Sequence, residues 1–133
     1  MRRREFVAGL AALSTVLVSW PAWASRWLEG SAASPAERLL AAFRHPDSAA
    51  AVGRAYLAGH PQDADTGCLV ETISKHLHCR GCDPAQTSRA DLRRAISHQV
   101  RDDFAQGRVV QVDGWVLSAT EAQLCGLAAL ARA

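Results

Sequence analysis

The sequence predicts a mainly α fold, a compact bundle of about five helices with one short two-stranded β-hairpin near the C-terminus. Apolar residues recur at helical spacing in about five segments, and residues that favour helix starts and stops bound these segments. The apolar period shortens to every second residue only around Asp113-Gly114, which predicts the hairpin. We expect a single helical domain over residues 34–133.

The first helix is predicted from the stretch Ser34-Pro35-Ala36-Glu37. Serine can cap a helix, proline suits the first helical position, and glutamate at the third position can reach back to the cap amide. His45-Pro46 is expected to close this segment, because the residue before a proline disfavours the helical conformation.

A second helix is predicted from Ser48 to about Ala58, with Asp47 or Ser48 as its cap and Gly59 as its stop. Gly53 lies inside this helix, where glycine costs about 1 kcal/mol relative to alanine. We therefore expect another helix to pack closely against Gly53.

Stripes of apolar residues at helical spacing predict the next two helices. One is predicted to begin near Asp65 or Thr66, and the longest is predicted to begin at Ser88 and to end at Gly107. Apolar residues at helical spacing predict the inner faces of both. These residues are Leu69, Val70, Ile73 and Leu77 in the first of the two, and Leu92, Ile96, Val100 and Phe104 in the longest helix.

The hairpin and a further helix are predicted after Gly107. Residues 109–112 and 115–117 are mostly valine and other apolar residues around Asp113-Gly114, a dipeptide typical of a two-residue hairpin turn. Ser118-Ala119-Thr120-Glu121 is a second capping box and opens a helix with leucine at helical spacing.

The N-terminal segment has the order of an export signal. Arginines at 2–4 precede an apolar run over 7–20, and the small-residue triplet Ala22-Trp23-Ala24 follows. The run is about 14 residues long, short of the roughly 20 that a membrane-spanning helix needs. We expect cleavage after Ala24, a flexible lead-in over 25–33 and no permanent membrane span. An uncleaved membrane anchor is the alternative.

Within this leader, Arg3-Arg4-Glu5-Phe6-Val7 resembles the twin-arginine (Tat) consensus, with Arg3, Arg4 and Phe6 as its matching residues. The resemblance implies an address read by the Tat translocase and says nothing about the fold. It predicts export to the periplasm or another extracytoplasmic space. An ordinary secretory signal also contains arginines and is the alternative.

The charge of the cleaved chain argues against nucleic acid as a partner. The full sequence has 15 basic and 13 acidic residues, and the leader contains three arginines and one glutamate. The remaining chain has 12 of each sign and no net charge, so the basic surface that nucleic-acid binding requires is not predicted. Nucleotide binding also lacks support, because no glycine-rich phosphate loop is present.

The densest group of chemically active side chains is His76-Leu77-His78-Cys79-Arg80-Gly81-Cys82-Asp83. A c-type haem site needs histidine directly after the second cysteine, where Asp83 stands, so haem attachment is excluded. Zinc or copper remains an alternative, because imidazole and thiolate are suitable ligands for both. The candidate ligands are His76, His78, Cys79 and Cys82.

Disulfides are the preferred interpretation of the cysteines, and no cofactor is expected with them. An exported protein meets oxidising conditions, under which four cysteines tend to pair. We predict Cys79 with Cys82 and Cys68 with Cys125, although sequence alone allows three pairings. A redox-active Cys79-Cys82 pair is a further alternative, but no βαβ pattern surrounds it. Free buried thiols are the last alternative.

Asp113 and Trp115 are candidate partner contacts. A tryptophan beside a tight turn can anchor a partner, since tryptophan is enriched at interface hot spots. The preferred interpretation is that the Trp115 ring packs across the helix that follows and seals a small core. No catalytic set is predicted, because Ser34 and Ser118 already have capping functions and no nucleophile motif is present.

The stretch VVQVDGWVLSATEAQLCGLAAL resembles the end of a group of small exported bacterial proteins of unassigned activity that carry a twin-arginine leader. The upstream stretches GRAYLAGHP and RDDFAQGR are similar to that group as well. Gln123 stands where the group's pattern has arginine. The resemblance implies an exported protein with this fold and supplies no catalytic residue.

These observations together predict a non-enzymatic periplasmic protein, an accessory or interaction module. A small subunit can carry the twin-arginine signal for a partner that lacks one, so an escort of an exported oxidoreductase fits the pattern. The alternative function is a metal-binding or redox protein that uses the cluster at 76–82.

Overall fold

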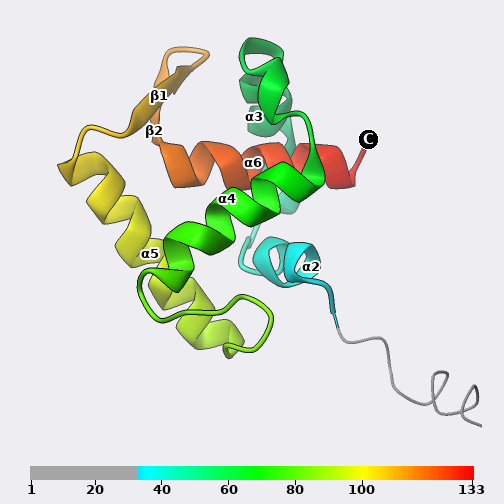
Figure 1. Ribbon diagram of the computed structural model, residues 1–133. Helices are drawn as coiled ribbons and strands as arrows, with labels where there is room; N and C mark the ends of the chain where they lie inside the picture. Colours follow the sequence, from blue (N-terminus) through cyan, green and yellow to red (C-terminus); the bar gives the residue numbers. More distant parts are fainter. Residues whose placement is uncertain (1–32) are drawn as a thin grey trace, which may run out of the picture. The chain divides into compact units, whose positions relative to one another are not determined.

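The computed structural model describes residues 33–133, so the predictions for the leader and for residues 25–32 lie outside the described residues. Five helices, a 3-10 turn and a hairpin follow one another in this part of the chain (Figure 1), which confirms the predicted fold class. The elements are α2 (Pro35–Leu40), α3 (Pro46–Gly59), η1 (Pro61–Asp63), α4 (Thr66–His78), α5 (Arg89–Ala105), β1 (Val109–Val112), β2 (Trp115–Ser118) and α6 (Ala119–Ala131).

Helix α6 is the centre of the fold. It contacts the other four helices and both strands, and Figure 1 shows the helices arranged around it. Its side chains are mostly small or apolar and are buried around its whole circumference. A helix that is apolar on all sides has to be enclosed by its neighbours. The buried residues are Thr120, Ala122, Leu124, Gly126, Leu127, Ala128 and Ala129.

The backbones of α3 and α6 touch at Gly53. A Cβ atom at this position would collide with the carbonyl group of Cys125 and would lie 2.9 Å from the backbone nitrogen of Gly126. Gly126 is in turn close to the ring of Tyr56. The prediction that another helix packs against Gly53 is therefore confirmed.

Leucine and isoleucine side chains from α2, α4, α5 and α6 form the main core. The predicted inner stripe of α4 is confirmed, because Leu69, Ile73 and Leu77 are buried and Val70 is partly buried. A smaller cluster around Tyr56, Val112 and Ala122 joins the hairpin to α3 and α6. None of the helices in residues 33–133 is long and apolar enough to cross a membrane.

The start of α3 differs from the prediction. The helix begins at Pro46, and its N-cap is His45, whose side chain makes no capping hydrogen bond. The prediction of Asp47 or Ser48 as the cap was wrong, because proline has the φ of a first helical residue and lacks the N–H that a cap would satisfy. The other predicted caps, Ser34, Asp65 and Ser118, accept their expected hydrogen bonds.

Helix α2 is shorter than predicted and ends at Leu40. Two arginines of α5 bind the carbonyl oxygens that follow it, Arg89 to Ala41 at 2.7 and 3.1 Å and Arg93 to Ala42 at 3.3 Å. Such side-chain donors satisfy carbonyl groups that a continuing helix would have bonded itself.

The predicted inner face of α5 was wrong in its second half. Leu92 is buried, but Phe104 is 47% exposed, and the buried residues further along are Gln99 and Asp103. A helix turns about 100° per residue, so a repeat of four residues drifts by about 40° at each step. Phe104 therefore lies roughly 120° away from Leu92, whereas spacings of seven and eleven residues return to within about 20° of it.

The hairpin is confirmed with the predicted turn. β1 and β2 pair antiparallel, with Val110 opposite Leu117 and Val112 opposite Trp115. Asp113 and Gly114 have φ of 48° and 82°, the two positive values that a type I′ turn requires. β2 extends one residue beyond the prediction to Ser118, which then caps α6.

Candidate functional site

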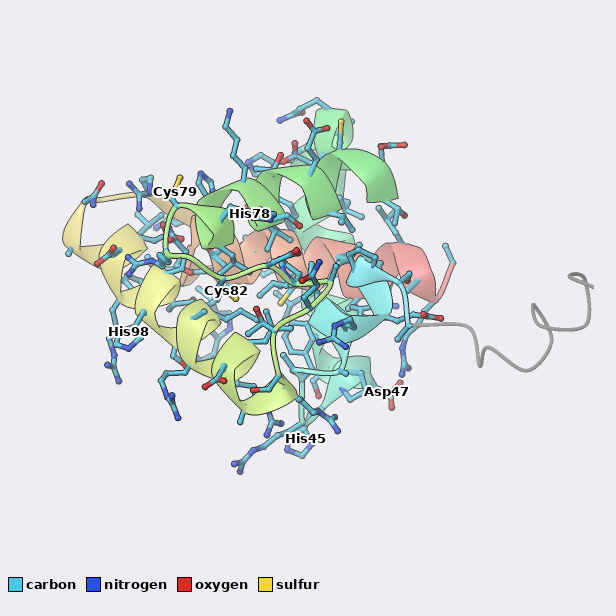
Figure 2. All side chains as sticks on the ribbon, turned by 60° about the horizontal axis from the view of Figure 1, so that its bottom comes forward. His45, Asp47, His78, Cys79, Cys82 and His98 are labelled. Carbon is cyan, nitrogen blue, oxygen red and sulfur yellow. The ribbon has the colours of Figure 1, made fainter. Side chains whose placement is uncertain are left out.

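The predicted metal ligands do not converge on one point. His78 is exposed, with Nδ1 2.7 Å from the Ser74 carbonyl oxygen and Nε2 3.7 Å from Asp83 Oδ1. Cys79 is exposed at the end of α4, whereas Cys82 is only 6% exposed and belongs to the main core. Figure 2 shows these three residues spread around the turn that follows α4. Across residues 33–133, no three His, Cys, Asp or Glu side chains gather closely enough to hold a metal ion.

The four thiols are free in the structure. Cys68 and Cys79 are exposed, and Cys82 Sγ lies 3.5 Å from Thr87 Oγ1. Burial, and then the nearby charge of Glu121, raises the pKa of the Cys125 thiol to about 11. Both disulfides stay predictions that an oxidised sample has to test.

A buried polar network replaces the expected apolar end of α5. Asp103 is 1% exposed, and its Oδ2 accepts hydrogen bonds from the Thr120 backbone nitrogen at 2.9 Å and from Thr120 Oγ1 at 2.6 Å. Its Oδ1 accepts from Gln99 Nε2 at 3.0 Å and from Arg108 Nε at 2.9 Å. One carboxylate thus joins α5, the chain entering β1 and the start of α6.

This network keeps Asp103 ionised. Burial by itself raises the pKa of Asp103, but the hydrogen bonds from Thr120, and then those from Arg108 and Gln99, outweigh it and hold the pKa below its usual value. The carboxylate also forms an ion pair with Arg108, whose Nη2 lies 2.9 Å from Oδ1. All its acceptor capacity is used within the protein, so it anchors the fold and is unsuited to proton transfer.

Two of the predicted site residues, His76 and Cys79, meet above this network. Together with Arg80, they line an open pocket of about 380 Å³ between the end of α4, α5 and Arg108. Arg80 Nε donates to Gln99 Oε1 at 2.9 Å, and its guanidinium forms an ion pair with Asp102. These residues were not grouped from the sequence, although Cys79 and Arg80 follow His76 by three and four residues, the spacing of neighbours on a helix surface.

The hairpin carries the largest exposed apolar side chain of the described chain. Trp115 is 74% exposed, so the prediction that it seals the core was wrong. It pairs with Val112, and Val112, at 6% exposed, fills the space against α3 and α6 instead. Trp115 lies next to the turn, at the end of the hairpin furthest from α6.

A groove of about 420 Å³ runs beside Trp115, between the hairpin and α3. Its walls are mainly apolar, with Val52 from α3 and Val112 and Leu117 from the hairpin. Asp113 is exposed and lines the groove at the turn. The two candidate partner contacts, Asp113 and Trp115, therefore line one groove.

Comparison of the chain with family models, with curated proteins and with solved structures finds no match. The resemblance to small exported bacterial proteins accordingly stays a prediction.

Proposed function

We propose that this protein is a non-enzymatic interaction protein of the periplasm, exported by the Tat pathway, that binds another exported protein through its hairpin. The observation that carries the proposal is the 74% exposure of Trp115 next to a tight turn. We call Trp115 and the groove beside it, lined by Val52, Val112 and Leu117, the hairpin surface.

The hairpin surface has the properties of a contact anchor. Contiguous apolar area on a soluble protein is favourable only when something covers it, and tryptophan dominates the energy of many interfaces. The two-residue turn fixes the backbone beside Trp115, so little conformational entropy would be lost on binding. The partner's contact face is therefore expected to be apolar, with a basic group facing Asp113.

The most obvious serine for catalysis has another function. Ser118 is fully buried, and its hydroxyl accepts the Glu121 backbone N–H at 3.0 Å. The Glu121 carboxylate in turn accepts the Ser118 backbone N–H at 2.9 Å. Both groups complete the N-terminal cap of α6, which supports a non-enzymatic function.

The leader motif supports the remaining parts of the proposal. Arg3, Arg4 and Phe6 match the signal of a pathway that carries folded cargo, and a small folded subunit can take a partner with it. An exported oxidoreductase that lacks its own leader is the partner class we propose.

Photo-crosslinking in the periplasm tests the proposal. A photoreactive amino acid at Ala51, an exposed residue of α3 that lines the groove beside Trp115, should give one discrete adduct. The same amino acid at the exposed Glu71 of α4 should give none. The further substitution Trp115→Ala should abolish the Ala51 adduct while changing the free energy of unfolding by less than about 1 kcal/mol. Equal labelling from Ala51 and Glu71, or labelling that survives Trp115→Ala, would contradict a specific hairpin contact.

The alternative function, metal or redox chemistry at the 76–82 cluster, is supported only by the meeting of His76 and Cys79 in one pocket. Intact mass and metal analysis of protein purified from periplasm separate the interpretations. Loss of about four protons without metal is expected for the two predicted disulfides. Bound zinc or copper that disappears in Cys79→Ser would instead establish the alternative.

A further inference from the structure

The pocket above the Asp103 network has a floor of buried polar residues. Gln99 and Asp103 are 5% and 1% exposed, and both accept hydrogen bonds from arginine side chains that reach the surface. The hydrogen bonds to Gln99 and Asp103 consequently hold the Arg80 and Arg108 side chains in position in the pocket wall. Solvated surface arginines can adopt many conformations. Here each guanidinium group is restricted to one position, because it is hydrogen-bonded to a buried acceptor.

Most hydrogen-bond acceptors of this pocket are already occupied, and Asp102 Oδ1 is the exception within residues 33–133. Each oxygen of Asp103 accepts at least two hydrogen bonds, Gln99 Oε1 accepts from Arg80, and Asp102 is ion-paired with Arg80. The nitrogen atoms without a partner are Arg80 Nη1, which makes no hydrogen bond within residues 33–133, and His76 Nδ1. The His76 nitrogen is buried and has no partner in the described part of the chain.

The unused groups suit an anion and do not suit a metal ion. Two guanidinium groups in the wall would repel a cation, and only His76 and Cys79 could act as soft ligands. Guanidinium N–H groups and an imidazole N–H are suited to carboxylate, phosphate or sulfate oxygens. A buried nitrogen without a partner also costs free energy, and a rotation of the His76 ring toward the pocket would let such an oxygen recover it.

We propose that this pocket, lined by His76, Cys79, Arg80 and Arg108, binds a small oxyanion, with Arg80 and His76 as the principal hydrogen-bond donors. Asp102 and Asp103 balance the two arginine charges, so recognition depends on directed N–H groups at short range. This inference is independent of the proposed function, because the pocket shares no residue with the hairpin surface.

Cys79 provides a reporter inside the pocket, and Cys68 provides an internal control. Both thiols are exposed, and Cys68 lies at the opposite end of α4, beside the Asp65 cap. Alkylation of fully reduced protein with iodoacetamide, a neutral reagent, can be followed separately at each cysteine by peptide mass spectrometry. A ligand that fills the pocket should slow alkylation at Cys79 only.

The experiment compares sodium phosphate, sulfate and acetate with chloride at constant ionic strength. At an anion concentration ten times its half-saturating value, alkylation of Cys79 should slow about tenfold by mass action, with no change at Cys68. Protection by phosphate or sulfate would identify a tetrahedral anion, and protection by acetate alone would identify a carboxylate. Absence of saturable protection by all three anions would overturn the proposal.

Two variants locate the binding site. Arg80→Gln and His76→Gln should each abolish the protection of Cys79, whereas Lys75→Gln, which removes a charge from the neighbouring residue of α4 outside the pocket, should retain it. If Arg80→Gln disturbs the fold through Gln99, His76→Gln keeps the test valid, because His76 Nδ1 has no partner in residues 33–133 to lose. Protection that persists in His76→Gln would show that the anion binds elsewhere.

Discussion

At the scale of single residues, Asp103 is the polar side chain on which the fold depends most. Its carboxylate is buried and satisfies donors from α5, α6 and the chain entering β1. Replacement by Asn keeps the size but removes the charge that Arg108 needs, and it places a donor where only acceptors fit. We expect Asp103→Asn to lower the free energy of unfolding by about 2 to 4 kcal/mol, measured by denaturant titration.

The neighbouring carboxylate is the matched control for this substitution. Asp102 is 46% exposed and pairs with Arg80 near the surface. An ion pair in that environment contributes about 1 kcal/mol or less. A loss at Asp102→Asn as large as that at Asp103→Asn would show that burial of Asp103 is not the cause.

The lowered pKa of Asp103 also predicts a dependence on pH. A carboxylate whose pKa is lower in the folded than in the unfolded protein contributes stability above the unfolded value, about 3.9, and this contribution is lost as the pH falls through the folded value. The difference in unfolding free energy between the wild-type protein and Asp103→Asn should therefore shrink below about pH 4. A difference that stays constant between pH 7 and pH 3 would contradict this assignment.

Leu92 and Phe104 test the corrected face of α5. Leu92 is 1% exposed, so Leu92→Ala should cost about 2 to 5 kcal/mol. Phe104 is 47% exposed, so Phe104→Ala should cost less than about 1 kcal/mol. Thermal unfolding monitored by circular dichroism would measure both, and similar losses at the two positions would favour the four-residue stripe predicted from sequence.

At the scale of elements, the close contact between α3 and α6 is possible only because Gly53 has no side chain. Alanine favours helices by about 1 kcal/mol over glycine, but a methyl group here would collide with the Cys125 carbonyl group. We expect Gly53→Ala to destabilise the protein by about 2 kcal/mol or more, because two backbones would have to separate.

Gly59 is the control for Gly53 in the same helix. A Cβ atom at Gly59 has nothing within 4 Å. Gly59→Ala is therefore expected to change the unfolding free energy by less than about 1 kcal/mol, or to raise it slightly. If both substitutions had the same effect in a denaturant titration, close helix packing would not explain Gly53.

The sequence predicted the elements better than it predicted their inner faces. Caps at Ser88 and Ser118 and the turn at Asp113-Gly114 are local signals, in which the residues that decide the geometry are neighbours. The pairing of Asp103 with Thr120 is set by how α5 and α6 cross, which no local pattern contains. The burial of Trp115 was predicted wrongly for the same reason, since its exposure depends on how far the hairpin extends beyond α6.

The candidate site was predictable only in part. The stretch 76–82 was recognised as chemically active, and two of its members, His76 and Cys79, share a pocket. The partners that complete the pocket, Gln99 and Arg108, come from distant segments and were not foreseen. Spacings of seven and eleven residues from Leu92 along α5 would have indicated that polar residues face inward.

At the scale of the whole molecule, export is the prediction that matters most. Changing Arg3-Arg4 to Lys-Lys should block transport by the Tat route, because that signal is read by a receptor that recognises the arginine pair. Fractionation of cells that express the two forms measures the effect, with an unrelated Sec-dependent protein as the control. Unchanged export of the Lys-Lys form would indicate the general secretory route.

The central position of α6 has a consequence for how the protein is made. Domains generally fold as units, and the N-terminal part of a chain leaves the ribosome first. Here the helix around which α2, α3, α4 and α5 pack is synthesised after all of them. The earlier helices cannot complete the core until α6, which ends at Ala131, has emerged, so the predicted leader would be available on the nascent chain before the domain can finish folding.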